Sequence, residues 1–292
     1  RKTSIFQAGR HNHILSGSST FVNFNNNLQP GLFFSKEILI RLFFLPLGVH
    51  RLADKICLIQ SNNPIATHFF VFENFRKNFV SFEEATSKGP LKSSFNNPAT
   101  AIFGFADSYK KQLELELRKV ERTLFNSETI LHLYHFSNLG QKPEIIHYTL
   151  EAEEFTFYIS CQNSYPEAWQ KFVKAHANPG NFKKYFFDRE IGEWRGKEGE
   201  LVTFEDYAKW KNLVLNNLLQ RRSLRNYFLR WSQFEAFPME IIYNYQISIR
   251  FMQQKTINII CEVSNFICSH DENFIEKSLK ALNQAATKKE LR

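Results

Sequence analysis

The sequence predicts an α+β protein: a mixed N-terminal α/β domain, residues 1–164, followed by a mainly helical C-terminal bundle, residues 165–292. Three observations support this prediction. Hydrophobic residues make up 43% of the 292 residues and charged residues 23%, a balance typical of globular chains and not of disordered ones. Apolar runs with strand-like patterning occur in the first half. Helical periodicity, interrupted by short glycine-containing loops, dominates the second half.

The first elements expected are a loop region and a helix. Residues 1–34 are rich in Ser, Asn and Gly, which suit turns. The most apolar run, ILIRLFFLPLGVHR at residues 38–51, contains an arginine, a proline and a glycine. It is also shorter than the ~20 apolar residues that a membrane-spanning helix needs. We therefore expect a buried helix that begins near Ser35 and ends before Pro46.

A strand and a polar connection are expected next. The run KICLIQSNNP, residues 55–64, predicts a buried strand that leads into a turn. The run THFFVFENF, residues 67–75, is compatible with a second strand or a short helix. A polar stretch broken by glycine and proline, residues 87–98, predicts a linker.

A long helix and two neighbouring strands complete the predicted N-terminal domain. The helix is expected over residues 107–125, because its Leu and Val side chains fall on one face. EIIHYTL at residues 144–150 and FTFYISC at residues 155–161 predict the strands. In the second run, apolar residues alternate with others as on one face of a sheet.

The second half predicts helices separated by loops. Thr203 followed by Asp206 approximates a capping box, which predicts a helix start. The run that follows Pro238 favours a helix over a strand. The single helix that begins at Thr203 is expected to carry one apolar stripe, formed by Tyr207, Trp210, Val214 and Leu218. A second helix, or a continuation of the first past Ser223, is expected to carry another, formed by Leu224, Tyr227, Phe228 and Trp231.

Charge and cysteine usage limit the partners and the compartment. The formal net charge of +8 favours polyanionic partners. The four cysteines are scattered without a C-x-x-C pair, so neither a zinc ribbon nor a disulfide framework is indicated. The first thirty residues lack the layout of a secretory signal. We therefore expect a cytoplasmic protein with reduced thiols, no cofactor and no membrane segment.

Motifs of common enzymes are absent from the sequence. It contains no G-x-x-x-x-G-K-[ST] phosphate loop, no G-x-G-x-x-G and no G-x-S-x-G elbow. The pairs His132/His135 and His11/His13 have no companion ligands nearby, so no metal site is predicted. A metal-dependent nuclease stays open as an alternative, because residues 186–197 gather three carboxylates beside Arg and Lys. The ordinary interpretation of that segment is a solvated loop with salt bridges.

Basic segments with aromatic neighbours, and one Asn-rich loop, are the candidate sites for nucleic acid. Lysine and arginine can hold phosphates, and Asn or Gln can bond base edges. A solvated helix face and a turn-rich connection are the competing interpretations. The candidate nucleic-acid-binding residues are Asn23, Asn25, Asn26, Asn27, Gln29, Lys183, Lys184, Arg221, Arg222 and Arg225.

The order of motifs over residues 20–80 resembles a known family. VNFN is followed by GLFFSKEILIRLFFLPLG, ICLIQSNNP and THFFVFENFRKNF. This order resembles the N-terminal region of the large subunit of type I CRISPR Cascade complexes, in the branch of subtypes I-A and I-B that includes cyanobacterial members. The helical second half is similar in layout to that family's small-subunit-like bundle. Many relatives hold zinc with a cysteine pair where this chain has FFSK, residues 33–36, so no zinc site is carried over.

The resemblance implies a non-enzymatic subunit of an RNA-guided antiviral defence complex. Such a subunit recognises the motif that flanks the target (the PAM), binds double-stranded target DNA and helps R-loop formation, while guide pairing supplies sequence specificity. The implied partners are the CRISPR guide RNA, target DNA and the backbone, end-capping and small subunits of Cascade. The sequence leaves open which flanking motif is read and whether a helicase-nuclease or transposition proteins are recruited. A protein-only scaffold with incidental positive charge is the third alternative.

Overall fold

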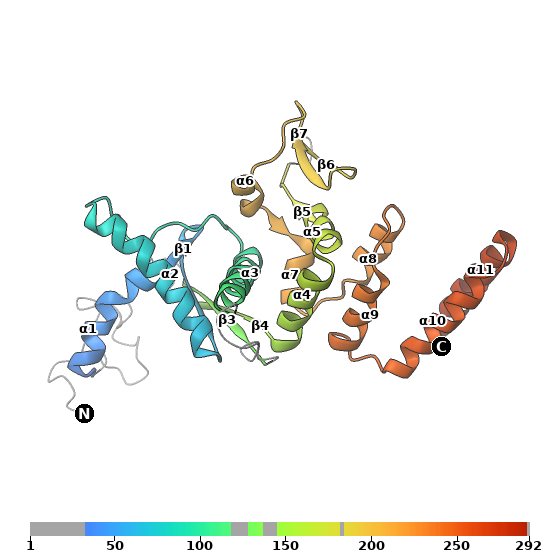
Figure 1. Ribbon diagram of the computed structural model, residues 1–292, viewed down its shortest axis with the longest axis horizontal. Helices are drawn as coiled ribbons and strands as arrows, with labels where there is room; N and C mark the ends of the chain where they lie inside the picture. Colours follow the sequence, from blue (N-terminus) through green and yellow to red (C-terminus); the bar gives the residue numbers. More distant parts are fainter. Residues whose placement is uncertain (1–32, 118–127, 137–144, 182–183, 291–292) are drawn as a thin grey trace. The chain divides into compact units, whose positions relative to one another are not determined.

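The computed structural model describes residues 33–117, 128–136, 145–181 and 184–290. It confirms the predicted α+β class, since a four-stranded sheet is combined with helices throughout the described chain (Figure 1). The chain forms two compact units, Arg1–Ala236 and Phe237–Arg292. The domain boundary expected at residues 164/165 falls inside the first unit, between helix α4 (Ala152–Ser164) and helix α5 (Pro166–Ala175).

The main sheet is fully antiparallel, with the strand order β1-β2-β3-β4. Alternate residues of β2 and β3 are buried, so one face of the sheet belongs to the core. The strands expected at residues 55–64 and 144–150 are confirmed as β2 and β4. The bounds are β1 (His50–Leu52), β2 (Lys55–Ser61), β3 (Leu131–Phe136) and β4 (Ile145–Leu150).

Helix α1 (Lys36–Phe44) begins where the sequence predicts, because the Ser35 hydroxyl accepts a hydrogen bond from the Ile38 backbone N–H at 3.3 Å. A 3₁₀ turn, η2 (Leu45–Gly48), continues the chain through the proline. The prediction that this helix is buried is wrong for the described part of the chain, where none of its residues is buried. Phe43 and Phe44 are both more than 60% exposed, because no described element covers the outer face of α1.

Helix α2 (Pro64–Glu83) settles the choice left open for residues 67–75 in favour of a helix. Its start follows from two neighbouring residues. The Asn63 side chain accepts from the Ile65 N–H at 3.0 Å, and Pro64 occupies the first helical position, where its missing N–H costs nothing.

The segment after α2 packs on the sheet instead of acting as a free linker. The Arg51 N–H donates to the Leu91 carbonyl at 2.8 Å, and the Ser93 N–H donates back to the Arg51 carbonyl at 2.7 Å. Helix α3 (Pro98–Leu117) follows and begins nine residues before the helix predicted at residues 107–125. The end of that predicted helix lies outside the described residues.

Residues 155–161 form part of helix α4, so the strand predicted there is wrong. The reason is that the helix is buried over a broad face, which leaves Glu153, Thr156, Asn163 and Ser164 exposed. Six of its residues are buried among its neighbours, which include α3 and α5, and apolar residues therefore appear at every second position as well as at helical spacing.

The single helix predicted from Thr203 onward is divided into α6 (Phe204–Lys209) and α7 (Leu213–Leu219). Thr203 does cap α6, with its hydroxyl accepting from the Asp206 N–H at 3.2 Å. The division occurs at the buried residue Asn212, whose amide group donates to the Val173 carbonyl at 2.7 Å and whose oxygen caps α7. A long-range hydrogen bond thus overrides the local helical pattern.

Short strands and one more helix complete the first unit. β5 pairs with β8 just before α7, and β6 pairs with β7 in a hairpin. The helix predicted around Leu224 is confirmed as α8. The bounds are β5 (Ala177–Asn178), β6 (Tyr185–Asp188), β7 (Glu193–Gly196), β8 (Lys211–Asn212) and α8 (Arg225–Ser232).

The second unit is helical, as the sequence predicts for this part of the chain. It contains α9 (Met239–Ser248), α10 (Gln254–Cys268) and α11 (Glu272–Glu290). The preference for a helix over a strand after Pro238 is therefore confirmed. Among the described residues of both units, no helix combines the length and the apolar character that a membrane crossing requires.

Candidate functional site

The sequence-predicted nucleic-acid residues fall into two groups in the structure. The Asn-rich loop and Lys183 lie outside the described residues; this group comprises Asn23, Asn25, Asn26, Asn27, Gln29 and Lys183. The four others are exposed: Lys184 directly precedes β6, Arg221 and Arg222 follow α7, and Arg225 is the first residue of α8.

Arg221 is held by two carboxylates. Its Nε donates to Oε1 of Glu154 at 2.9 Å and its second guanidinium nitrogen donates to Oε2 at 3.2 Å, while Glu153 accepts at 3.3 Å. The Glu154 side chain is only 3% exposed, so Arg221 supplies hydrogen bonds that water cannot readily replace. The hydrogen bonds that Arg221 donates to Glu154 raise the pKa of Arg221. Arg221 is therefore poorly suited to hold a phosphate.

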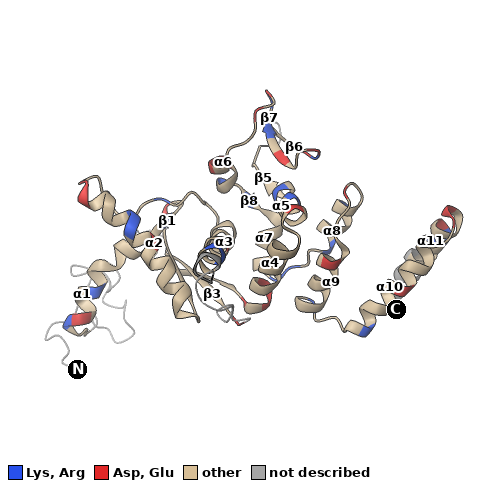
Figure 2. Cartoon of the chain, in the orientation of Figure 1, with Lys and Arg blue, Asp and Glu red and all other residues tan. Residues whose placement is uncertain are grey.

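Arg222 lies on the connection between α7 and α8 and Arg225 is the first residue of α8; both are exposed, and Figure 2 shows basic residues along this part of the chain. Lys184 is not next to them in the chain. It precedes the β6–β7 hairpin, which follows β5, and β5 pairs with β8 at the start of α7, whereas the arginines follow the end of α7. Arg222 and Arg225 are therefore near each other in the chain, after α7, whereas Lys184 comes before α7.

Two of the three carboxylates of the nuclease alternative, Asp188 and Glu193, are used in structural contacts. Asp188 accepts from Nε of Arg195 at 2.8 Å and from the backbone N–H groups of Glu190 and Ile191. The Ile191 N–H and the Arg195 guanidinium hold the pKa of Asp188 below its usual range. Glu193 pairs with Lys174. The segment is the hairpin with salt bridges that the ordinary interpretation expects.

The histidine pair at positions 132 and 135 is separated by the sheet. On a strand, residues three apart point to opposite faces. His135 is buried and contacts the Leu52 carbonyl at 3.2 Å, whereas His132 lies 3.1 Å from His147 on the other face. Among the described residues, no group of three or more His, Cys, Asp or Glu side chains is placed to hold a metal ion.

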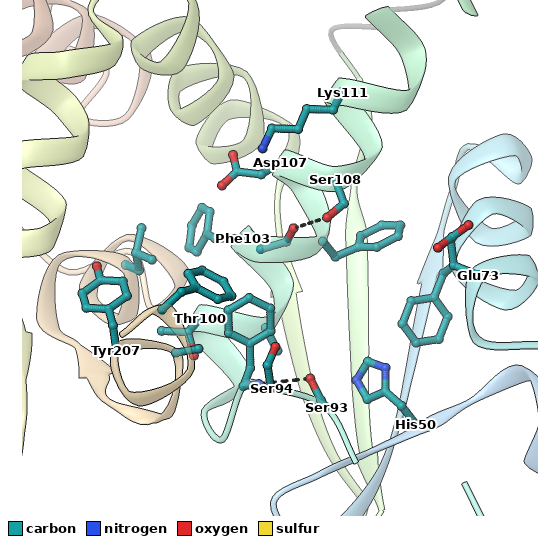
Figure 3. Close-up of a pocket in the computed structure, with 18 of the residues that line it drawn as sticks. His50, Glu73, Ser93, Ser94, Thr100, Phe103, Asp107, Ser108, Lys111 and Tyr207 are labelled. Atoms are coloured by element: carbon teal, nitrogen blue, oxygen red, sulfur yellow. Dashed lines mark hydrogen bonds between the residues drawn. The ribbon is translucent and has the colours of Figure 1, made fainter. Parts of the chain in front are cut away.

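A cavity of about 600 Å³ lies along α3, and we name it the α2–α3 cavity. Its walls come from α2, residues 91–95 and α3, with α4, α5, α6 and α7 closing the remaining side. Its volume is in the usual range of small-molecule sites. Figure 3 shows aromatic and polar side chains of these elements converging on it.

Aromatic rings form much of the wall of this cavity. Phe95 and Phe204 meet edge to face, with ring centroids 6.2 Å apart, and Phe103 and Tyr158 lie 4.7 Å apart. Gly104 allows Phe95 to sit directly on α3, because a Cβ at this position would lie only 2.4 Å from the Phe95 ring. A substitution at Gly104 would thus move one wall of the cavity.

His50 brings an unsatisfied acceptor to the cavity. The Asn74 amide nitrogen donates to the Phe70 carbonyl at 2.8 Å, so its oxygen must accept, and it lies 3.1 Å from Nδ1 of His50. Nδ1 is therefore the protonated nitrogen. Nε2 is buried and has no hydrogen-bond partner among the described residues. Burial also lowers the pKa of His50, which favours the neutral ring and leaves Nε2 with a lone pair.

Asp107 is the second acceptor of the cavity. Its Oδ2 accepts from the Tyr158 hydroxyl at 2.8 Å, and burial raises the pKa of its carboxyl group. Lys111 and Asp107 lie on the same stretch of α3 (Figure 3). Among the side chains that the structure describes, neither Lys92 nor Lys111 has a carboxylate within ion-pair distance.

The sequence alone does not predict this cavity. Its members are spread from His50 to Leu215, and no two of the polar residues singled out above form a recognisable motif. The one available signal was the high number of phenylalanines, 31 in the chain, which is equally typical of an ordinary core.

Comparisons with models of known protein families, with curated proteins and with solved structures find no match to this chain. The class of protein is therefore argued from the pattern of residues and from the geometry described above.

Proposed function

We propose that this chain is a non-enzymatic, nucleic-acid-binding subunit like the large subunit of type I CRISPR Cascade complexes. In that role it recognises the target-flanking motif, binds double-stranded target DNA and helps R-loop formation. The observation that carries the proposal is the order of motifs over residues 20–80. The described part of this region forms consecutive elements, α1, η2, β1, β2 and most of α2, that lead into the main sheet.

Charge supports the same proposal. The formal net charge of +8 favours a polyanion as partner, and Arg222 and Arg225 present two exposed positive charges between the end of α7 and the start of α8. These arginines would contact phosphates, which fix position and affinity but carry no sequence information. The proposed partners are guide RNA, target DNA and the backbone, end-capping and small subunits, together with a helicase-nuclease or transposition proteins.

Purification of the tagged chain from its native cells tests this function. We expect it to co-purify with further protein subunits and with RNAs that share one constant flanking sequence and differ in the guide portion. The chain recovered without RNA, in a complex of proteins alone, would favour the scaffold alternative.

Charge reversal tests the role of the two arginines in the purified complex. Arg222→Glu combined with Arg225→Glu is expected to lower the slope of log affinity for duplex DNA against log salt by about 2, since each lost phosphate contact removes about 0.9. The matched control is Lys255→Glu with Lys277→Glu, which makes the same charge change at two exposed sites of the second unit. Equal effects of the two double variants would contradict a specific role for the arginines.

The nuclease alternative makes a separate prediction. Incubation of labelled DNA with the chain and Mg²⁺ or Mn²⁺ should then produce cleavage that Asp188→Ala abolishes. The proposed function expects intact DNA, because Asp188 is already bonded to Arg195 and to two backbone N–H groups.

A further inference from the structure

The α2–α3 cavity combines three features that together suit one kind of ligand. Aromatic rings form much of its wall, and nucleobases stack on such rings whatever their sequence. Its unused buried polar atom, Nε2 of His50, is an acceptor, so a ligand that fills the site should bring an N–H donor. Lys92 and Lys111 supply positive charge at its lining, and the charge of Lys111 acts on the neighbouring Asp107, whose pKa burial raises and Lys111 lowers.

These features argue against two simpler ligands, an apolar molecule and an inorganic anion. An apolar ligand would leave Nε2 of His50 buried and unpaired, which costs free energy. An inorganic anion would use the lysines and leave the rings without a contact. A nucleotide satisfies all three, because its base has a flat face and N–H groups while its phosphate is negative.

We propose that the α2–α3 cavity binds one unpaired nucleotide of a nucleic-acid strand. The base lies against the aromatic wall and donates an N–H to His50, and the adjoining phosphates face Lys92 and Lys111. The inference rests on the proposed function, because strand separation is what presents an unpaired base to this chain. The α2–α3 cavity would then be the surface that holds one of the separated strands.

A binding comparison on the purified full chain tests the inference. The probes are a 12-nucleotide single-stranded DNA of mixed sequence and a strand of the same length and charge made of abasic residues throughout. Base–aromatic stacking predicts that the abasic strand binds about 5- to 100-fold more weakly. Fluorescence anisotropy at one fixed salt concentration measures the ratio.

Two variants locate this difference in the cavity. Ser108 lines the cavity at an exposed position of α3, so Ser108→Trp should fill its entrance and bring the ratio close to one while binding of the abasic strand is retained. Ser264→Trp places the same side chain at an exposed position of α10 and should leave the ratio unchanged. Circular dichroism confirms that each variant is folded.

The possible results distinguish a failure of the cavity assignment from a failure of the proposed function. Equal affinity for the two strands, or a ratio that Ser108→Trp leaves unchanged, overturns the inference while salt-dependent binding still supports the function. No binding of either strand at low salt overturns both. Free mononucleotides that displace the intact strand at comparable concentration would assign the cavity to a free nucleotide and overturn its assignment to a strand.

Discussion

Replacement of Asn78 by alanine is expected to destabilise the first unit by about 2–4 kcal/mol, because it leaves one buried and two partly buried backbone groups without this partner. Asn78 is 4% exposed. Its amide nitrogen donates to the Leu47 carbonyl at 2.9 Å and to the Val49 carbonyl at 2.8 Å, and its oxygen accepts from the Leu91 N–H at 2.8 Å. One side chain thus ties α2 to the segments on both sides of it.

The gain in helix propensity does not offset this loss. Alanine is the better helix former by roughly 0.7 kcal/mol, well below the cost of the unpaired groups. Urea denaturation followed by tryptophan fluorescence measures the change, and all four tryptophans lie in the first unit. The control Asn226→Ala, at an exposed position of α8, should stay within about 0.5 kcal/mol of the parent. An Asn78→Ala midpoint equal to that of the control would contradict the bonding described.

Replacement of Arg221 by alanine is expected to cost about 1–3 kcal/mol, less than the loss of a fully buried ion-pair partner, because water can reach the site. The cost arises at Glu154, whose carboxylate is buried and would lose both guanidinium hydrogen bonds. The Arg221 side chain itself is 52% exposed, which is why the expected value is below that for a fully buried pair.

A double-mutant cycle isolates the pair. Glu154→Gln removes the buried charge, so Arg221→Ala should cost clearly less in that background than in the parent. Arg225→Ala is the matched control: Arg225 is exposed at the first position of α8, and its replacement should change the free energy of unfolding by no more than about 0.5 kcal/mol. A cycle with no coupling, or a cost as large for Arg225→Ala, would show that the Arg221 contacts do not stabilise the fold.

Local signals predicted the elements that local chemistry determines. The start of α1 follows from the Ser35 cap, and β2 and β4 follow from short apolar runs bounded by turn residues. Elements that depend on distant partners were missed. Residues 155–161 form a helix because neighbouring helices bury a broad face of it, and a long-range bond from Asn212 divides α6 from α7.

The candidate site depends even more on contacts between residues that are distant in the sequence, so less of it could be predicted. Exposure of Arg222 and Arg225 could be predicted, because the apolar stripe around them faces the core. The partner of Arg221 could not be predicted, since Glu154 lies 67 residues away in the sequence. The α2–α3 cavity depends on long-range packing in the same way, and only the fold brings its aromatic wall, His50 and its lysines together.

The salt dependence of duplex DNA binding tests the central claim most directly. The purified full chain is titrated against a labelled duplex at several NaCl concentrations, and log affinity is plotted against log salt. Phosphate contacts by Lys184, Arg222 and Arg225 alone predict a slope of about −3 or steeper, since each contact contributes about −0.9. A chain that does not bind DNA at low salt, or whose affinity does not change with salt, would contradict the proposal that this protein is a nucleic-acid-binding subunit.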